Sequence, residues 1–248
     1  MSIGDPSIPH DRSSRPQDWA SFVLIAAIVG AAGLAVSGRW QLALAAVGLA
    51  AVAGVAAVRW SRANPGPMPY AFRWVLLLPR GAHAPRHVLA LLAPRPGERM
   101  LEIGPGIGVH ALPIAAALTP NGRLQVLDAQ QAMLDAVSSR AAQAGIANID
   151  LRHGDACTLP FEDASFDAAY LNGVLGELPD PAGALHELRR VLKPKGRLMI
   201  GETMLDPDYV PERTLVRLAT DAGFVVERRE GSWWASLTRF RPVDAPHT

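Results

Sequence analysis

The chain has 248 residues, of which 49% are hydrophobic and 19% are charged, and its formal net charge is +1. A charge this close to zero gives no general attraction to nucleic acid, and the apolar content excludes a mainly disordered chain. The one cysteine, Cys157, excludes an internal disulfide framework and a zinc site built from cysteines. The length suits one catalytic domain plus an additional segment.

The apolar excess lies near the N-terminus. Residues 19–38 and 40–58 carry no charged side chain, and Arg39 alone separates them. As a helix that rises about 1.5 Å per residue, each stretch matches a bilayer core of about 30 Å. We therefore expect a tail over 1–18 and a transmembrane helical hairpin over 19–60. Two buried helices of a soluble domain are the alternative, which the absence of a polar face disfavours.

Arginine residues flank the predicted hairpin more often than they occupy its turn. Arg12 and Arg15 precede the first stretch, whereas Arg59, Arg62 and Arg73 follow the second. By the positive-inside rule, this two-pass protein of the cell membrane should have its tail and its catalytic domain on the cytoplasmic side. Neither stretch contains an ionisable group, so the hairpin is expected to anchor the protein rather than to transport a solute.

Residues 61–83 are predicted to form an interfacial linker. Their Pro- and Gly-rich part, residues 64–69, breaks helices and is a natural boundary. Tyr70, Phe72 and Trp74 then alternate with arginine, which suits the headgroup layer of a membrane. Packing of these aromatic rings on the core of the next domain is an equal alternative, and Tyr70 is also a candidate lid over a site.

Residues 84–248 change to alternating strands and helices. Strands are expected at 100–103, 124–127, 149–151, 166–171, 197–200, 224–228 and 233–240, and helices at 109–118, 131–143, 181–192 and 210–222. This alternation implies βαβ units. We expect an α/β fold with a Rossmann-like, doubly wound, mostly parallel seven-stranded sheet, preceded by the two transmembrane helices. Ligands of such sheets bind at the carboxyl ends of the strands.

A glycine-rich turn follows the first predicted strand of this domain. Gly104, Gly106 and Gly108 form a G-x-G-x-G pattern, and Glu102 precedes them. Glycine lets a ligand approach the backbone, and the following helix points free N–H groups at that ligand. A dinucleotide-binding turn requires its third glycine at position 109, where the chain has valine. The spacing therefore disfavours an NAD-dependent oxidoreductase.

Acidic residues follow the second and third predicted strands. Asp128 lies about 20 residues beyond the glycine turn, where a carboxylate can accept both hydroxyl groups of a ribose. Asp155 follows the third strand, where a carboxylate beside a backbone N–H can bind the amine and a ring nitrogen of adenine. The order of these acids along the chain favours a nucleoside-containing cofactor.

Together these residues resemble the class I S-adenosylmethionine-dependent methyltransferases, in their ubiquinone/menaquinone-methyltransferase-like branch. The resemblance covers about residues 84–240 and includes the segments 159–167 (LPFEDASFD) and 191–196 (VLKPKG). It implies a methyltransferase domain over 84–248 with S-adenosylmethionine as the cofactor. Gln130 departs from the family pattern, since many relatives have a serine helix cap there.

The resemblance also implies a set of cofactor-binding residues. Glu102 and the glycine turn would hold the methionine end, Asp128 the ribose, and Asp155 the adenine. Met133 matches the position that packs on the nucleoside. The full set is Glu102, Gly104, Pro105, Gly106, Gly108, Asp128, Ala129, Met133, Asp155, Ala156 and Asn172.

Methyl transfer from a sulfonium needs mainly alignment and exclusion of water, and a base helps where the acceptor loses a proton. Glu177 is the first candidate base and His110 the second. Their alternatives are a surface acid near a helix start and a histidine that satisfies local hydrogen bonds. Asn172 and Glu202 could line the cofactor or acceptor pocket. The remaining histidines lack ligand spacing, so no metal is expected.

These features predict a membrane-anchored methyltransferase. Its acceptor would be lipophilic, such as a quinone precursor, a phospholipid or another hydrophobic small molecule, because anchoring raises the effective concentration of the enzyme near solutes of the bilayer. The expected partners are the lipid bilayer and this acceptor, and not nucleic acid. A tethered broad-specificity methyltransferase and a non-catalytic cofactor-binding membrane module are the alternatives.

Overall fold

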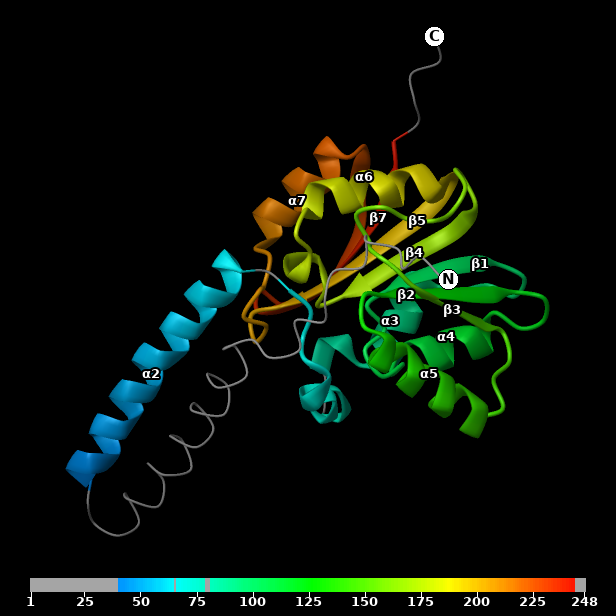
Figure 1. Cartoon of the computed structure of the whole chain (residues 1–248). Coiled ribbons are helices and arrows are strands. Elements are labelled where there is room, and N and C mark those ends of the chain that lie inside the picture. Colours follow the sequence, from blue (N-terminus) through cyan, green and yellow to red (C-terminus); the bar gives the residue numbers. More distant parts are fainter. Residues whose placement is uncertain (1–39, 65, 79–80, 244–248) are drawn as a thin grey trace, which may run out of the picture. The chain divides into compact units, whose positions relative to one another are not determined.

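The computed structural model describes residues 40–64, 66–78 and 81–243. The chain divides into two compact units, Met1–Asn64 and Pro65–Thr248. The described part of the first unit is dominated by the helix α2, Trp40–Ala63, and the second unit contains all the strands (Figure 1).

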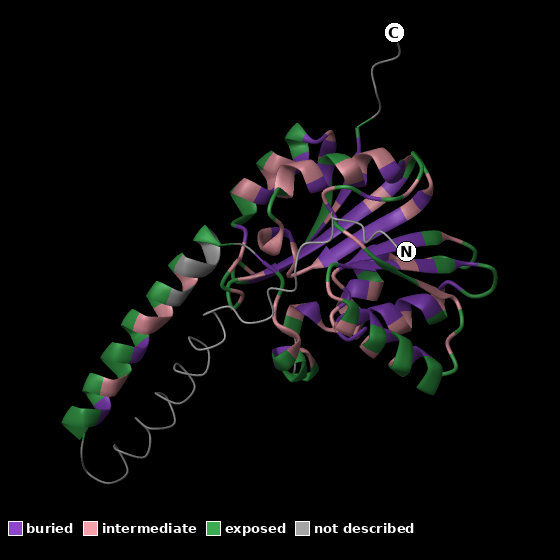
Figure 2. Cartoon of the chain, in the orientation of Figure 1, coloured by how far each residue is buried: buried purple, intermediate pink, exposed green. Residues whose placement is uncertain are grey.

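Helix α2 is rich in alanine and leucine, which favour helices. Its large apolar side chains are exposed (Figure 2): Trp40, Leu42, Leu44, Val47, Leu49, Val52 and Val55. A helix over the predicted span 40–58 is therefore confirmed. Among the described helices, however, none has both the length and the apolarity needed to cross a membrane, so the crossing predicted for this segment is not supported. The predicted tail 1–18 and the first predicted span, 19–38, lie outside the described residues.

The second unit is built on a seven-stranded sheet with the order β3-β2-β1-β4-β5-β7-β6. The parallel strands are β1 (Arg99–Ile103), β2 (Arg123–Asp128), β3 (Ile149–His153), β4 (Phe166–Asn172) and β5 (Leu192–Thr203). Strand β7 (Ala235–Pro242) runs antiparallel between β5 and β6 (Phe224–Gly231). The predicted mostly parallel, seven-stranded sheet is confirmed. Because the strand order reverses between β1 and β4, a ligand site is expected at their carboxyl ends.

Helices cover both faces of the sheet (Figure 1). One face carries α3 (Pro85–Leu92), α4 (Ala111–Ala117) and α5 (Gln131–Gln143), and the other carries α6 (Pro181–Val191) and α7 (Glu212–Asp221). Three short 3-10 helices are η1 (Tyr70–Leu77), η2 (Gly81–His83) and η3 (Leu175–Glu177). The predicted helices over 109–118 and 210–222 begin later, because turn residues precede them.

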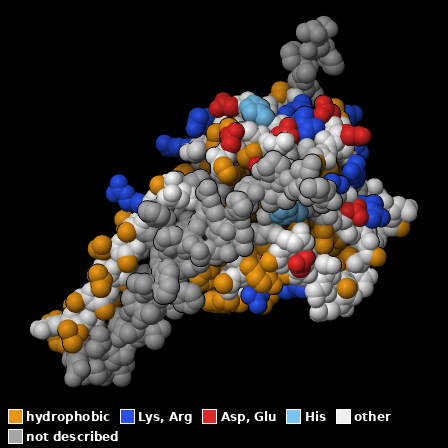
Figure 3. Space-filling model, in the orientation of Figure 1, with side chains coloured by type: hydrophobic (Ala, Val, Ile, Leu, Met, Phe, Trp, Pro, Cys, Tyr) orange, Lys and Arg blue, Asp and Glu red, His pale blue; other side chains and the backbone are white. Residues whose placement is uncertain are grey.

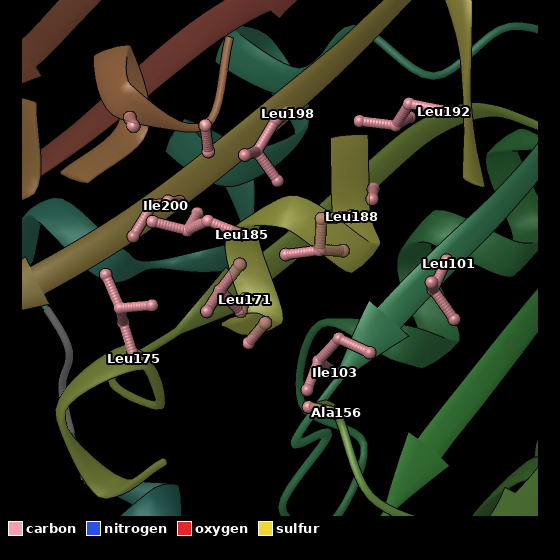
Figure 4. Packing of buried hydrophobic residues seen from close by; sticks show 14 of the residues in the cluster. Leu101, Ile103, Ala156, Leu171, Leu175, Leu185, Leu188, Leu192, Leu198 and Ile200 are labelled. Carbon is pink, nitrogen blue, oxygen red and sulfur yellow. The ribbon is translucent and has the colours of Figure 1, made fainter. Parts of the chain in front are cut away.

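Alternate residues of β1 pack on opposite faces of the sheet, as strand geometry requires. Leu101 and Ile103 belong to the core cluster that includes Leu185 and Leu188 of α6 (Figure 4). Met100 belongs to the cluster on the face of α3, α4 and α5. Each fully buried side chain of this size contributes about 1.5–3 kcal/mol through burial. The two clusters fix the strand ends that carry the candidate site.

Candidate active site

The glycine turn after β1 requires glycine for two reasons. Gly104 and Gly106 have φ values of 65° and 55°, in the left-handed region that other residues rarely adopt. A Cβ atom on Gly104 would lie 2.5 Å from Cγ2 of Val174, and one on Gly106 would lie 2.5 Å from Cδ1 of Leu76. The predicted tight turn is confirmed, and side chains from two other segments pack directly on it.

Glu102 lies at the buried end of β1, beside this turn. Its Oε2 atom has no hydrogen-bond partner among the described residues. Burial raises the pKa of Glu102 to about 8, against the lowering effect of the Tyr170 hydroxyl beside it, and the charge of Asp128 adds a smaller rise. A buried carboxyl oxygen without a partner fits a ligand that brings an ammonium group, which would restore the ionised form.

Asp128 ends β2 at the same edge of the sheet and is also buried. Its Oδ1 atom accepts a hydrogen bond from the backbone N–H of Gln130 at 2.7 Å. Burial raises the pKa of Asp128 to about 6, against a lowering effect of that hydrogen bond. The Asp128 carboxylate lies at the end of the strand, where the sequence predicted that it would bind a ribose. Ala129, the next residue, is exposed.

Asn172 ends β4 and pairs with Gly201 of β5. The missing Cβ at Gly201 leaves room for the Asn172 side chain, whose Oδ1 would collide with any larger residue. Neither amide atom of Asn172 finds a partner within the described part of the chain. Polar atoms in this state fit a ligand with its own donors and acceptors.

The predicted adenine and nucleoside residues lie on adjoining elements. Asp155 is exposed, and its Oδ1 accepts the backbone N–H of Cys157 at 2.8 Å. Ala156 is buried in the loop after β3, and Met133 is buried in the first turn of α5. Their contacts with a cofactor stay predictions.

His110 precedes α4 and is buried. Its Nε2 atom lies 2.9 Å from the carbonyl oxygen of His83, which connects the helix start to η2. This contact fits the alternative in which the histidine only satisfies hydrogen bonds of the fold. The catalytic role of His110 stays a prediction.

Glu177 lies in η3, after β4, where its Oε2 accepts the backbone N–H of Met68 at 3.4 Å. Burial, followed by the negative charge of Asp206, raises the pKa of Glu177 well above its usual range. A carboxyl group with a raised pKa is a better proton acceptor near neutral pH than an ordinary one. The geometry therefore keeps Glu177 as the first candidate base.

Sequence reasoning missed the loop after β5. Asp206 accepts the backbone N–H of Asp208 at 2.9 Å, and burial raises the pKa of Asp206 to about 6. Its Oδ2 atom packs on Gly173, close to where η3 begins. Glu202, at the base of the loop, is buried and accepts the backbone N–H of Val210 at 3.0 Å. The signal for this loop in the sequence was the close spacing of Glu202, Asp206 and Asp208 after a predicted strand.

For residues 66–78, which lie over the site, sequence reasoning offered only Tyr70 as a candidate lid, and we call these residues the cover segment. The side chain of Gln130 donates a hydrogen bond from Nε2 to the carbonyl oxygen of Met68 at 2.9 Å. Met68 also donates its N–H to Glu177, and Leu76 lies on Gly106. The one signal was Gln130, which makes no side-chain cap for α5 and binds the cover segment instead.

The aromatic residues of the cover segment divide between the two predicted roles. Phe72 is buried, so the core-packing alternative is confirmed for it, whereas Trp74 is exposed. Tyr70 is partly buried, and the guanidinium of Arg73 lies 4.4 Å from its ring centroid. From the cover segment, Leu76 packs on the glycine turn at Gly106, and the role of Tyr70 as a lid stays a prediction. In the described ranges, no three histidine, cysteine or acidic side chains are placed to hold a metal ion.

Comparisons with known proteins find matches for part of the chain. Residues 101–200 match the methyltransferase domain family. The chain is 38% identical over 163 residues to an uncharacterized 37.1 kDa protein in transposon TN4556 of Streptomyces fradiae, a match that covers 56% of this chain and 47% of that protein. It is 31% identical over 118 residues to a demethylmenaquinone methyltransferase of Bacillus cytotoxicus, covering 48% of this chain and 50% of that protein. The chain thus spans about half the length of these relatives.

Solved structures share the fold. A SAM dependent methyltransferase from Aquifex aeolicus superposes with a TM-score of 0.64 at 21% identity, covering 70% of this chain and 98% of that chain. A putative sarcosine dimethylglycine methyltransferase from Galdieria sulphuraria gives a TM-score of 0.55 at 18% identity, covering 64% and 84%. Residues 101–200 thus match a methyltransferase domain, in agreement with the sequence resemblance, and the second unit has the fold of these solved structures.

Proposed function

We propose that this chain, which contains an S-adenosylmethionine-dependent methyltransferase domain, transfers the methyl group to a lipophilic acceptor at a membrane. The observation that carries the methyltransferase part is the convergence of Glu102, Asp128 and Asn172 on the glycine turn at the carboxyl ends of β1, β2 and β4. These three polar side chains come from three strands and are buried or lack hydrogen-bond partners. They therefore support a polar ligand at that edge of the sheet.

The residues present fit S-adenosylmethionine. The unpartnered Oε2 atom of Glu102 suits the ammonium of the methionine moiety, and the carboxylate of Asp128 suits the ribose hydroxyls. Gly104, Gly106 and Gly108 of the turn have no side chains, and glycine permits a ligand to approach the backbone closely once the side chains packed on the turn move. When bound, the cofactor supplies a methyl group on a positively charged sulfur.

The chain's own residues align the acceptor, exclude water and receive a proton. The cover segment excludes solvent from the glycine turn through Leu76, and alignment in a dry site accounts for much of the rate enhancement of a displacement reaction. Glu177 accepts the proton that a hydroxyl, enol or ammonium acceptor loses, because its raised pKa makes its carboxylate a competent base.

Two observations support a lipophilic acceptor at a membrane. One relative, at 31% identity, is named a demethylmenaquinone methyltransferase, and demethylmenaquinone is an apolar molecule. Helix α2 exposes large apolar side chains along its length, a surface that favours a lipid environment or another apolar cover over water (Figure 3). The enzyme is proposed to associate with the membrane through the residues before Asn64.

The test is incubation of the full chain with methyl-labelled S-adenosylmethionine and a total lipid extract, followed by fractionation. We expect label in the neutral lipids that contain quinone precursors. Label in polar lipid would point to a phospholipid acceptor, and label in water-soluble acceptors alone would support the broad-specificity alternative. The Asp128→Ala chain is the control, since it should transfer no label to any fraction. Tight cofactor binding with no label anywhere would support a non-catalytic module.

A further inference from the structure

The second unit exposes large apolar side chains in two main places. One is η1 with the residue after it, and the other comprises the tips of the loop after β5 and of the β6–β7 hairpin. Leu205 is 81% exposed and Trp233 is 77% exposed. We call the set the apolar rim: Trp74, Leu77, Leu78, Leu205, Trp233 and Trp234. Isolated exposed apolar residues are ordinary, but a cluster with two neighbouring tryptophans indicates a contact surface.

The two places adjoin one another. The loop after β5 joins the β6–β7 hairpin through the N–H of Met204, which donates to the carbonyl oxygen of Trp234 at 2.8 Å. A Cβ atom built on Gly81, just beyond η1, would touch the ring of Trp234 at 3.9 Å. His83 in η2 fixes this arrangement, because its Nε2 lies 3.2 Å from the carbonyl oxygen of Ser236. The residues that follow η1 therefore lie beside the β6–β7 hairpin, within the second unit.

The inner side of the same loops faces the candidate active site. Leu205 points into solvent while the next residue, Asp206, packs on Gly173 and affects the charge of Glu177. Leu77 is exposed while its neighbour Leu76 lies on the glycine turn. Two residues of the rim are thus direct sequence neighbours of residues that pack beside the candidate site.

Positive charge accompanies the rim. A surface hollow of about 260 Å³ is lined by Leu76–Leu78, Ala84, Pro85, Val109 and Arg140, and is apolar except for that arginine. Arg73 and Arg140 form no ion pair with a carboxylate within the described ranges. Figure 3 shows hydrophobic side chains gathered over the η1 segment, with basic side chains at their edge.

We propose that the apolar rim docks the methyltransferase domain on the surface of a lipid bilayer with anionic headgroups. Tryptophan and leucine at loop tips enter the interfacial layer, and Arg73 and Arg140, which form no ion pair within the described ranges, bind lipid phosphates. This contact belongs to the second unit itself and is additional to any attachment by residues before Asn64. It deepens the proposed function, on which it rests, because it places the covered site against the phase that holds a lipophilic acceptor.

The test measures the depth of individual positions in the full chain. A nitroxide is attached at Leu205→Cys or Trp233→Cys, in a Cys157→Ser background, and the protein is bound to vesicles of phosphatidylcholine and phosphatidylglycerol. Leu151→Cys is the matched control, since Leu151 is also an exposed apolar residue but lies on β3, the strand at the opposite edge of the sheet from β6. Collision rates with oxygen, which concentrates in lipid, and with a water-soluble nickel chelate are compared.

We expect the ratio of oxygen to nickel collisions to rise several-fold at positions 205 and 233 on addition of vesicles, and to stay unchanged at position 151. Equal, water-like ratios at all three positions would overturn the proposal. Protection from both agents without vesicles would also overturn it, because that result means that protein covers the rim.

A second measurement links the contact to substrate. The double variant Leu205→Ser, Trp233→Ser should raise the KM for an acceptor presented in vesicles about tenfold, because apolar contact area with the bilayer is lost. Its affinity for S-adenosylmethionine and its turnover of a short-chain, water-soluble acceptor should not change. If the labels insert into lipid but the chain methylates no lipid, the proposed function is wrong. The docking surface is then still supported.

Discussion

The amide side chain of Gln130 donates a hydrogen bond to the carbonyl oxygen of Met68 at 2.9 Å, across 62 residues of sequence. Gln130 directly follows the strand that carries Asp128, and the N–H of Met68 reaches Glu177 after β4. One peptide segment is therefore bound to both the cofactor side and the candidate base. Leu76 of the same segment lies on Gly106, so we expect the segment to move when a cofactor enters the glycine turn.

Replacement of Gln130 with alanine is expected to loosen the cover segment. The variant loses one hydrogen bond, whose net value of about 0.5–1.5 kcal/mol corresponds to a decrease of about two- to tenfold in protection from exchange. Hydrogen exchange of the backbone amides in residues 66–78, read by mass spectrometry, measures the change. Gln143→Ala is the control, since Gln143 bonds only to Ser139 of the same helix. Unchanged exchange in both variants would show that the bond does not hold the segment.

Asp128→Ala is expected to weaken the binding of S-adenosylmethionine by about 100-fold or more, since hydrogen bonds to a charged group contribute about 1.5–3 kcal/mol each. The fold should persist, because the hydrogen bonds of the lost side chain are local, to the backbones of Ala129 and Gln130. Calorimetry gives the affinity and circular dichroism the fold. Asp221→Ala, at an exposed position on α7, should bind normally. Retained affinity in Asp128→Ala would mean that the ribose lies elsewhere.

Glu177→Gln is expected to slow turnover while cofactor affinity changes little. In the unmodified protein the rate should rise with pH through the raised pKa of Glu177, since only the ionised carboxylate accepts a proton. The variant should lose this limb of the pH profile. Glu162→Gln, at an exposed position, is the matched control. A variant with unchanged turnover and an unchanged profile would remove Glu177 from the catalytic residues.

Glu202 makes stability depend on pH. Burial raises its pKa from an ordinary 4.5 to about 8, so between these values the folded protein keeps a proton that the unfolded chain releases. Stability from this group is fully present below pH 4.5 and falls as the pH rises to 8. At about 1.36 kcal/mol per pH unit, Glu202→Gln should gain on the order of 3 kcal/mol relative to the unmodified protein between these limits.

Urea unfolding of both proteins at pH 5 and pH 8 measures this difference. The glutamine side-chain oxygen can still accept the N–H of Val210, so the substitution preserves the local structure. An equal difference in the free energy of unfolding at the two pH values would contradict a raised pKa for Glu202.

The sheet and its order of elements could be predicted because their signals are local. Apolar runs such as residues 166–171 became strands, and the spacing of Gly104 and Gly106 located the turn. Asp128 could be placed because a residue at the end of a parallel strand lies at a fixed edge of the sheet.

The cover segment and the loop after β5 could not be predicted, because their roles depend on contacts between distant segments. The proline-rich residues 64–69 indicate only a break in a helix, and nothing in them specifies that Met68 will lie between Gln130 and Glu177. In the same way, the acidic residues around Asp206 are typical of a turn, but they do not specify that Asp206 will contact Gly173.

The most direct test of the account is titration calorimetry of the full chain with S-adenosylmethionine, its demethylated product and NADH. Glu102, Asp128 and the glycine turn predict heat of binding with the first two ligands and none with NADH. Heat with NADH and none with either adenosyl compound would contradict the assignment of this site and the methyl transfer proposed from it.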